Sequence, residues 1–262
     1  MTRIASVAPF APTRFSLALV AWACAFAATA QPVVIAPKAA EPFTLKANAD
    51  MAKALPFANK QDFEDAMRGF IGTVPDALVT GSGPRPVWNM KPYDFLKANE
   101  AADTVNPSLW RQAHLNPIPG LCKVTDRCYQ VGAFDVANVP IVEGDTSLIV
   151  IDPLLAAETA RAALDLYYQH RPKKPVGTVI YTHGHADHFG GVKGVVSEAD
   201  VAAGKVQVIA PSGFMESAVA ENILAGNAMN RRSQYQFGTL LPPGARGQVD
   251  TGLGKALARG TM

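Results

Sequence analysis

The chain has 262 residues, enough for one sizeable domain with a buried core. Hydrophobic residues make up 48% of it and charged residues 18%, a balance that excludes a disordered or fibrous protein. The formal net charge of +2 leaves no basic footprint, so we expect no nucleic-acid partner.

The N-terminus has the pattern of a secretory leader. Arg3 and Arg14 both precede an apolar run, FSLALVAWACAFAATA, and no acidic residue lies in this part of the chain. Ala28 and Ala30 fit an A-x-A cleavage pattern, so residues 1–30 are predicted to be a cleaved signal peptide and the protein to be periplasmic or secreted. The rival interpretation is an uncleaved anchor, but the run is short against the ~20 apolar residues of a spanning helix. We therefore expect no stable membrane anchor.

Residues 31–119 are predicted to be a leader followed by a wrapping segment. The Ala- and Pro-rich residues 32–41 suit a flexible leader. The stretch QDFEDAMRGFI places its apolar residues at helical spacing, which predicts a short amphipathic helix over residues 61–71. Residues 73–119 mix Pro and Gly with aromatic residues and are expected to be ordered but irregular.

Two cysteines would remain after cleavage of the leader, Cys122 and Cys128. An exported chain meets an oxidising compartment in which disulfides persist. If Thr125 centres a hairpin loop, the two cysteines fall opposite one another and can form a cross-strand disulfide. Two buried free thiols are the alternative, whereas a zinc ribbon would need two further cysteines.

From residue 120 onward the chain alternates between strand and helix patterns. The pattern predicts a meander of short strands ending at Asp152, an amphipathic helix over 156–171, and a buried strand over 176–182. It then predicts a helix near 190–196, a strand over 206–211 and a helix over 213–229. This order predicts an α/β layered fold with functional residues on loops at strand ends.

The stretch YTHGHADHFGG follows the second buried strand. His183 and His185 are two residues apart, so extended geometry points both imidazoles to the same face, as a Zn²⁺ site requires. Asp187 and His188 follow in the turn and could serve a second ion, while the Gly-Gly pair lets the backbone approach closely. A solvated His-rich loop is the alternative, but three histidines and an aspartate directly after a buried strand favour metal binding.

The motif THGHADH resembles the T-H-x-H-x-D-H signature of metallo-β-lactamase-fold hydrolases. Its surroundings, including LPFANKQDFEDAMRGFI, NPSLWRQAHLN, IVEGDTSLIVIDPL and ENILAGNAMNRRSQYQFG, are similar to the alkyl sulfatases, which hydrolyse linear alkyl sulfates such as dodecyl sulfate. The resemblance implies an αβ/βα sandwich and cleavage of a small-molecule sulfate ester by a metal-activated water, giving alcohol and sulfate.

The same resemblance implies roles for individual residues. His183 and His185 would bind one Zn²⁺, and Asp187 and His188 a second. Asp152 would hold the ligands through hydrogen bonds, with a purely structural turn at the strand end as the alternative.

Three further residues are candidates for binding the substrate. Arg231 and Arg232 suit a sulfate group because guanidinium matches oxyanions, and Tyr235 lies close to them in sequence. Surface charges are the competing interpretation for both arginines.

The resemblance also predicts an incomplete sandwich. No histidine follows His188, and His114 and His170 fit structural or surface positions better than a metal site. The family's remaining ligands come after a GLGKA segment, so residues 120–262 are expected to be the first part of the domain, with a sheet face and edge exposed and no full activity alone. A homodimer is expected only for a full-length form. The alternatives are another hydrolase of this fold, acting on a lactam, thioester or lactone, and a non-catalytic metal-binding fragment.

Overall fold

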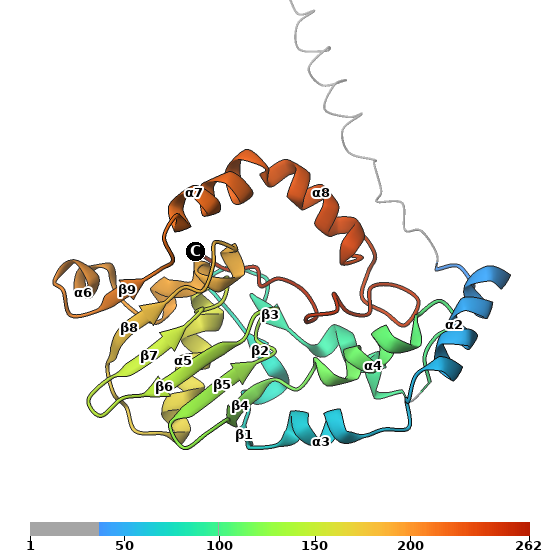
Figure 1. Cartoon of the computed structure of the whole chain (residues 1–262), viewed down its shortest axis with the longest axis horizontal. Coiled ribbons are helices and arrows are strands. Elements are labelled where there is room, and N and C mark those ends of the chain that lie inside the picture. Colours follow the sequence, from blue (N-terminus) through green and yellow to red (C-terminus); the bar gives the residue numbers. More distant parts are fainter. Residues whose placement is uncertain (1–36, 99) are drawn as a thin grey trace, which may run out of the picture. The chain divides into compact units, whose positions relative to one another are not determined.

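The computed structural model describes residues 37–98 and 100–262 (Figure 1). The predicted signal peptide, residues 1–30, lies outside the described residues, as does the start of the predicted leader. Residues 38–262 form one compact unit. Within the described ranges, no helix combines the length and apolar character needed to cross a membrane.

A seven-stranded sheet forms the centre of this unit, in the order β1-β4-β5-β6-β7-β8-β9. The strands are β1 (Phe70–Gly72), β4 (Gly120–Lys123), β5 (Cys128–Gly132), β6 (Val139–Glu143), β7 (Leu148–Ile151), β8 (Val176–Ile180) and β9 (Gln207–Ile209). Neighbours are antiparallel from β1 to β7, and β7, β8 and β9 are parallel. Helix α5 (Ala157–His170) supplies the crossover that a parallel β7–β8 pair requires. The predicted α/β alternation is confirmed.

The core lies between one face of the sheet and α5 (Figure 1). Along β6 and β7 alternate residues are buried, so Ile141 and Val150 pack with Leu166 of α5. Residues between them, such as Ile149, are only partly buried because they point to the opposite face. All three residues of β9 are exposed. The exposed β9 agrees with the predicted exposure of a sheet edge, whereas the outward-facing residues of β6 and β7 are half-buried.

The hairpin β4–β5 does not bring the two cysteines opposite one another. Cys122 pairs with Gln130, and the Val124 amide bonds to the Cys128 carbonyl, so Asp126 rather than Thr125 centres the loop. The cysteines are diagonal neighbours, farther apart than directly opposed residues. Both are free thiols in this hairpin, which is the alternative to a disulfide, although they are half-buried rather than buried.

The helix predicted over residues 61–71 is shorter than expected. Helix α3 spans Gln61–Met67, and Gly69 then adopts a left-handed φ of 72°. Gly69 also accepts a hydrogen bond from the Lys123 amide (2.7 Å), which starts the pairing of β1 with β4. Helical spacing therefore misassigned the last two apolar residues, because a strand distant in sequence captured them.

The wrapping segment contains more regular structure than its composition suggests. Helix α4 begins where the Asn106 side chain accepts the Ser108 amide, with Pro107 in the first turn. Residues 73–119 comprise η1 (Pro75–Ala77), β2 (Leu78–Val79), β3 (Trp88–Asn89), η2 (Lys91–Lys97) and α4 (Pro107–Leu115), and α2 (Pro42–Ala54) lies earlier in the chain.

Several short helices follow β8. They are η3 (Ala186–His188), η4 (Gly190–Gly194), α6 (Glu198–Ala202), α7 (Phe214–Val219), the π-helix η5 (Ala220–Leu224) and α8 (Gly226–Gln236). Figure 1 shows α7 and α8 as one nearly continuous helical run after β9. The helix predicted over 213–229 is therefore present, but it contains a π turn and extends to residue 236.

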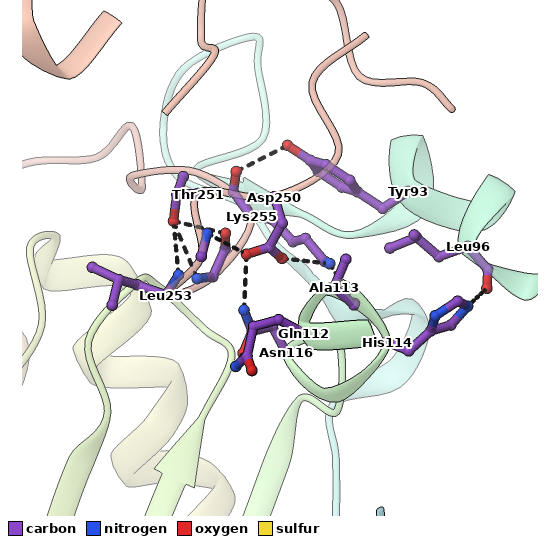
Figure 2. Close-up of polar contacts among 12 residues, drawn as sticks. Tyr93, Leu96, Gln112, Ala113, His114, Asn116, Asp250, Thr251, Leu253 and Lys255 are labelled. Atoms are coloured by element: carbon purple, nitrogen blue, oxygen red, sulfur yellow. Dashed lines mark hydrogen bonds and ion pairs between the residues drawn. The ribbon is translucent and has the colours of Figure 1, made fainter. Parts of the chain in front are cut away.

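A buried ion pair joins the last part of the chain to α4 (Figure 2). Lys255 Nζ donates to Asp250 Oδ2 and to the Ala113 carbonyl, both at 2.7 Å. Asn116 donates to the other oxygen of Asp250 at 2.8 Å. The side chains of Lys255 and Asp250 are 1% and 0% exposed, and burial lowers the pKa of Lys255 despite the ion pair.

The final residues are tied to the start of α5. The Ala157 amide donates to the Thr261 carbonyl at 2.7 Å, and the Thr261 amide donates to Glu158 Oε2 at 2.9 Å. These bonds place Met262 beside the loop that follows β8, where its Cε would lie 2.9 Å from a Cβ built on Gly190.

Candidate metal centre

The candidate metal centre lies where two neighbouring parallel strands end. Ile151 of β7 pairs with Ile180 of β8, so Asp152 and the loop that begins at Tyr181 leave the sheet side by side. The carboxyl ends of parallel strands are where α/β proteins commonly bind ligands. Three histidines therefore meet a buried aspartate at this edge.

Asp152 is the central acceptor of the cluster. It is 7% exposed and has a left-handed φ of 48°, a strained conformation that often marks a functional site. Oδ1 accepts the Thr182 amide (2.8 Å), and Oδ2 accepts the Thr182 hydroxyl (2.6 Å) and His188 Nδ1 (2.9 Å). Burial raises the pKa of Asp152, but these bonds outweigh it and hold the pKa below its ordinary value. Asp152 is therefore an ionised acceptor that orients Thr182 and His188.

The hydrogen bonds assign the ring nitrogens of His183. Because the Thr182 hydroxyl donates to Asp152, it must accept from His183 Nδ1, which lies 2.9 Å away. His183 Nε2 is then left with its lone pair. That nitrogen faces His185 Nδ1 at 2.9 Å, and the opposite nitrogen of His185 lies 3.0 Å from Glu221 Oε1.

This arrangement suits a metal ion. Two imidazole nitrogens face one another, and each ring has its other nitrogen committed to an outer partner, so their lone pairs repel unless a proton or a cation lies between them. Asp152, His183 and His188 each offer a ligand atom, all within 4.8 Å of one another. The donor set of imidazole and carboxylate matches the ligands that transition metals prefer.

The charges in the cluster favour a cation. Hydrogen bonds from His188 to Asp152 and then to Asp187 raise the pKa of His188 to about 9. Burial, together with His188 and His185, lowers the pKa of His183, which favours the neutral form that binds metals. Burial raises the pKa of Asp187, but the hydrogen bond and the charge of His188, together with the charge of His185, outweigh it and hold the pKa below its ordinary value, so the carboxylate is ionised. The field that stabilises an imidazolium here would also stabilise a metal ion.

The Gly-Gly pair brings the motif against the loop after β7. The Gly191 amide donates to the Leu154 carbonyl at 2.8 Å, and a Cβ on Gly191 would lie 2.2 Å from the Pro153 carbonyl oxygen. No larger residue fits there without a backbone shift. The predicted close approach of the backbone is confirmed.

Asp135 forms hydrogen bonds to the same loop, and no sequence motif marked this residue. Its Oδ2 accepts the Leu155 amide (3.1 Å), and its Oδ1 accepts the amides of Val136 (2.8 Å) and Ala258 (3.2 Å). Burial raises the pKa of Asp135 to about 6, although these three amides oppose the shift. Asp135 thereby joins the β5–β6 turn, the Asp152 loop and the end of the chain.

The structure links all four predicted metal ligands in one network. His183 contacts His185 and lies with its ring centroid 4.1 Å from that of His188, and His188 Nε2 lies 3.4 Å from Asp187 Oδ2. Asp152, which was predicted to hold the ligands, belongs to the tightest group itself.

The predicted substrate residues are not brought to the cluster. Arg231, Arg232 and Tyr235 lie on α8 and are exposed, Tyr235 to 81%. Among the residues that the structure describes, none of the three forms a hydrogen bond or an ion pair with the histidines or with Asp152.

The two remaining histidines lie elsewhere. His114 Nε2 lies 2.6 Å from the Leu96 carbonyl and its Nδ1 3.0 Å from the Trp110 carbonyl, so the ring joins α4 to η2. His170 ends α5, with its ring against Gly72 of β1. Both positions agree with the predicted structural or surface roles.

Two polar partners of the cluster were not predicted. Thr182 belongs to the motif but was assigned no role, and its hydroxyl donates to Asp152 and accepts from His183. Glu221 lies 36 residues after His185, and nothing in its local sequence marks it.

A family profile now assigns the class of protein. The profile described as "Metallo-beta-lactamase superfamily" matches residues 132–262, half of the chain, and the chain belongs to this superfamily. The α/β sheet with its histidine cluster at the strand ends is consistent with that membership.

Individual relatives point to one branch of the superfamily. The chain is 61% identical over 225 residues to the alkyl/aryl-sulfatase BDS1 of Saccharomyces cerevisiae, covering 86% of this chain and 35% of that protein. It is 55% identical to an (R)-specific secondary-alkylsulfatase of Pseudomonas sp., covering 88% of this chain and 35% of the relative.

A solved structure agrees with these similarities. The structure of the inverting sec-alkylsulfatase Pisa1 from Pseudomonas sp. aligns with a TM-score of 0.80 at 55% identity, covering 86% of this chain and 36% of that one. The chain thus spans about a third of the length of the relatives it matches.

Proposed function

We propose that the chain is the metal-binding part of a zinc-dependent alkyl sulfatase that hydrolyses linear alkyl sulfates, such as dodecyl sulfate, to alcohol and inorganic sulfate. One observation carries the proposal: Asp152, His183 and His188 bring ligand atoms within 4.8 Å of one another, and His185 and Asp187 adjoin them. Similarity to proteins named as alkylsulfatases, at 53–61% identity over most of the chain, supports the substrate class.

The proposed division of labour follows the contacts. His183, His185, Asp187 and His188 would hold two Zn²⁺ ions, with Asp152 keeping His188 oriented through its 2.9 Å bond. Zinc, when bound, lowers the pKa of water and polarises an ester oxygen.

The sulfate and alkyl groups are proposed to bind beside these residues. Relatives of similar identity are named for primary, secondary and aryl esters, so a panel of esters is needed to distinguish the preferred class.

The test is release of inorganic sulfate by the protein expressed from its complete reading frame. Dodecyl sulfate, a secondary alkyl sulfate, an aryl sulfate and a β-lactam are assayed in parallel, before and after chelation and with zinc restored. We expect zinc-dependent release from the linear alkyl ester, lost in His183→Ala and Asp187→Ala. Release that survives complete chelation, or hydrolysis of the β-lactam alone, would refute the proposal.

We also propose that the protein is exported. The support is the basic and apolar pattern of residues 1–30. N-terminal sequencing of the exported protein should begin at Gln31, and an intact Met1 on a protein retained in the cytoplasm would contradict it.

A further inference from the structure

We propose that Glu221 is a positioning residue that fixes the imidazole of His185 and commits its Nδ1 to a metal ion. The inference deepens the proposed function and rests on its metal site. Glu221 Oε1 lies 3.0 Å from His185 Nε2, and it comes from η5, an element well separated in sequence from the motif.

The element that carries Glu221 also holds the motif through the next residue. Asn222, the next residue, donates from Nδ2 to the Gly184 carbonyl (3.0 Å) and to the Ala218 carbonyl (2.8 Å). Two adjacent side chains of η5 therefore hold two adjacent residues of the loop, Gly184 and His185. Single π turns within helical runs occur frequently at functional sites.

The chemistry of the contact selects one ring nitrogen. A carboxylate only accepts hydrogen bonds, so His185 must present Nε2–H to Glu221, and its Nδ1 is the nitrogen left for a metal. That Nδ1 faces His183 Nε2 at 2.9 Å.

The same logic holds for all three imidazoles. Thr182 holds Nδ1 of His183, Asp152 holds Nδ1 of His188, and Glu221 holds Nε2 of His185. Outer hydrogen bonds of this kind fix the orientation and the tautomer of metal-binding histidines. Glu221 completes the set.

Because the contact between His185 and Glu221 is partly exposed to water, zinc affinity is a more informative measurement than folding stability. The side chains of His185 and Glu221 are 51% and 30% exposed, so water competes for the bond and its contribution to folding is small. Its effect should appear in metal affinity, because losing such a partner typically weakens binding about 10–100-fold. We expect a value near the lower end, about tenfold.

The first experiment compares zinc affinity among four forms of the full chain by competition with a chromophoric chelator. Glu221→Ala should weaken zinc binding about tenfold, whereas Glu221→Gln should bind nearly as wild type because its amide oxygen still accepts Nε2–H. Glu216→Ala is the matched control: Glu216 is an exposed carboxylate on α7 that forms no hydrogen bond or ion pair with the described residues. Unchanged affinity in Glu221→Ala overturns the proposal, and so does an equal loss in Glu221→Gln, which would make the carboxylate a ligand itself.

The second experiment observes the ring of His185 directly by ¹⁵N NMR. In wild type, Nε2–H of His185 should be slowed in solvent exchange, should remain so in Glu221→Gln, and should exchange rapidly in Glu221→Ala. Coordination of zinc through Nε2 would overturn the proposal without any variant. The solvent exchange of His185 Nε2–H can also be measured on the chelator-treated chain. A chain that fails to bind zinc would therefore refute the proposed metal site, whereas rapid exchange in the wild type without zinc would refute the contact with Glu221.

Discussion

Replacing Lys255 by Met should destabilise the fold by about 3 kcal/mol. The substitution keeps most of the side-chain volume but removes the ammonium from a pair whose side chains are 1% and 0% exposed. Removing one partner of a buried ion pair typically costs about 3–5 kcal/mol, because the other charge stays buried without compensation. Asp250 retains the amide donors of Asn116 and Gly252, which places the cost near the lower end.

The double variant Lys255→Met/Asp250→Asn separates the lost charge from the lost hydrogen bonds. It removes both charges, so the remaining cost is chiefly the Ala113 carbonyl, which loses its donor, at about 1–2 kcal/mol. The sum of the losses of unfolding free energy in the two single variants should therefore exceed the loss in the double variant by about 2 kcal/mol or more. Lys205→Met removes an exposed ion-pair partner, 71% exposed, and should change stability by less than ~1 kcal/mol.

The assay is urea unfolding followed by tryptophan fluorescence, with ΔG obtained by linear extrapolation and compared only where the slope m is unchanged. A cost below ~1 kcal/mol for Lys255→Met would refute the reasoning, since it would mean that water or a rearranged side chain compensates Asp250. A double variant less stable than either single variant would refute it as well.

Three other outcomes are expected. Gly191→Ala places a methyl group 2.2 Å from a carbonyl oxygen of the loop after β7, so zinc affinity in a chelator competition should fall at least tenfold; unchanged affinity would contradict the close packing. Asp152→Ala removes the main cause of the raised pKa of His188, so an NMR titration without zinc should show that pKa falling from about 9 toward its ordinary value. The Arg171 hydrogen bond lowers the pKa of Glu143 to about 2, so the stabilisation is complete above its ordinary value of 4.5 and is lost as the pH falls toward 2. Allowing for the 34% exposure of Arg171, it amounts to about 2 kcal/mol, and Glu143→Gln should show a flatter loss of stability in acid.

The metal motif could be predicted from the sequence because it is local. His183 and His185 follow a continuous apolar strand at a spacing of two residues, which predicted that their imidazoles meet, although β8 itself ends at Ile180. The position of Asp152 was predicted in the same way, because it directly follows the apolar strand β7. The order of strands and helices from residue 128 to 209 was equally readable, because each element carries its own hydrophobic period.

The errors occur where partners are distant in sequence or register is finely set. Glu221 reaches His185 only because of how η5 packs on the loop, and no local pattern encodes that packing. Shifting the hairpin centre by one residue, from Thr125 to Asp126, was enough to separate Cys122 from Cys128.

The position of Met262 has a practical consequence for purification. The bonds of Thr261 to the start of α5 hold the end of the chain beside Gly190, two residues from His188. In an expressed fragment that ends at Met262, a polyhistidine tag would follow a residue whose Cε approaches Gly190, and its imidazoles would compete with the candidate centre for metal ions. Metal stoichiometry measured on such a preparation would count the tag together with the protein, so a cleavable tag placed elsewhere, or a tag without histidine, is the appropriate choice.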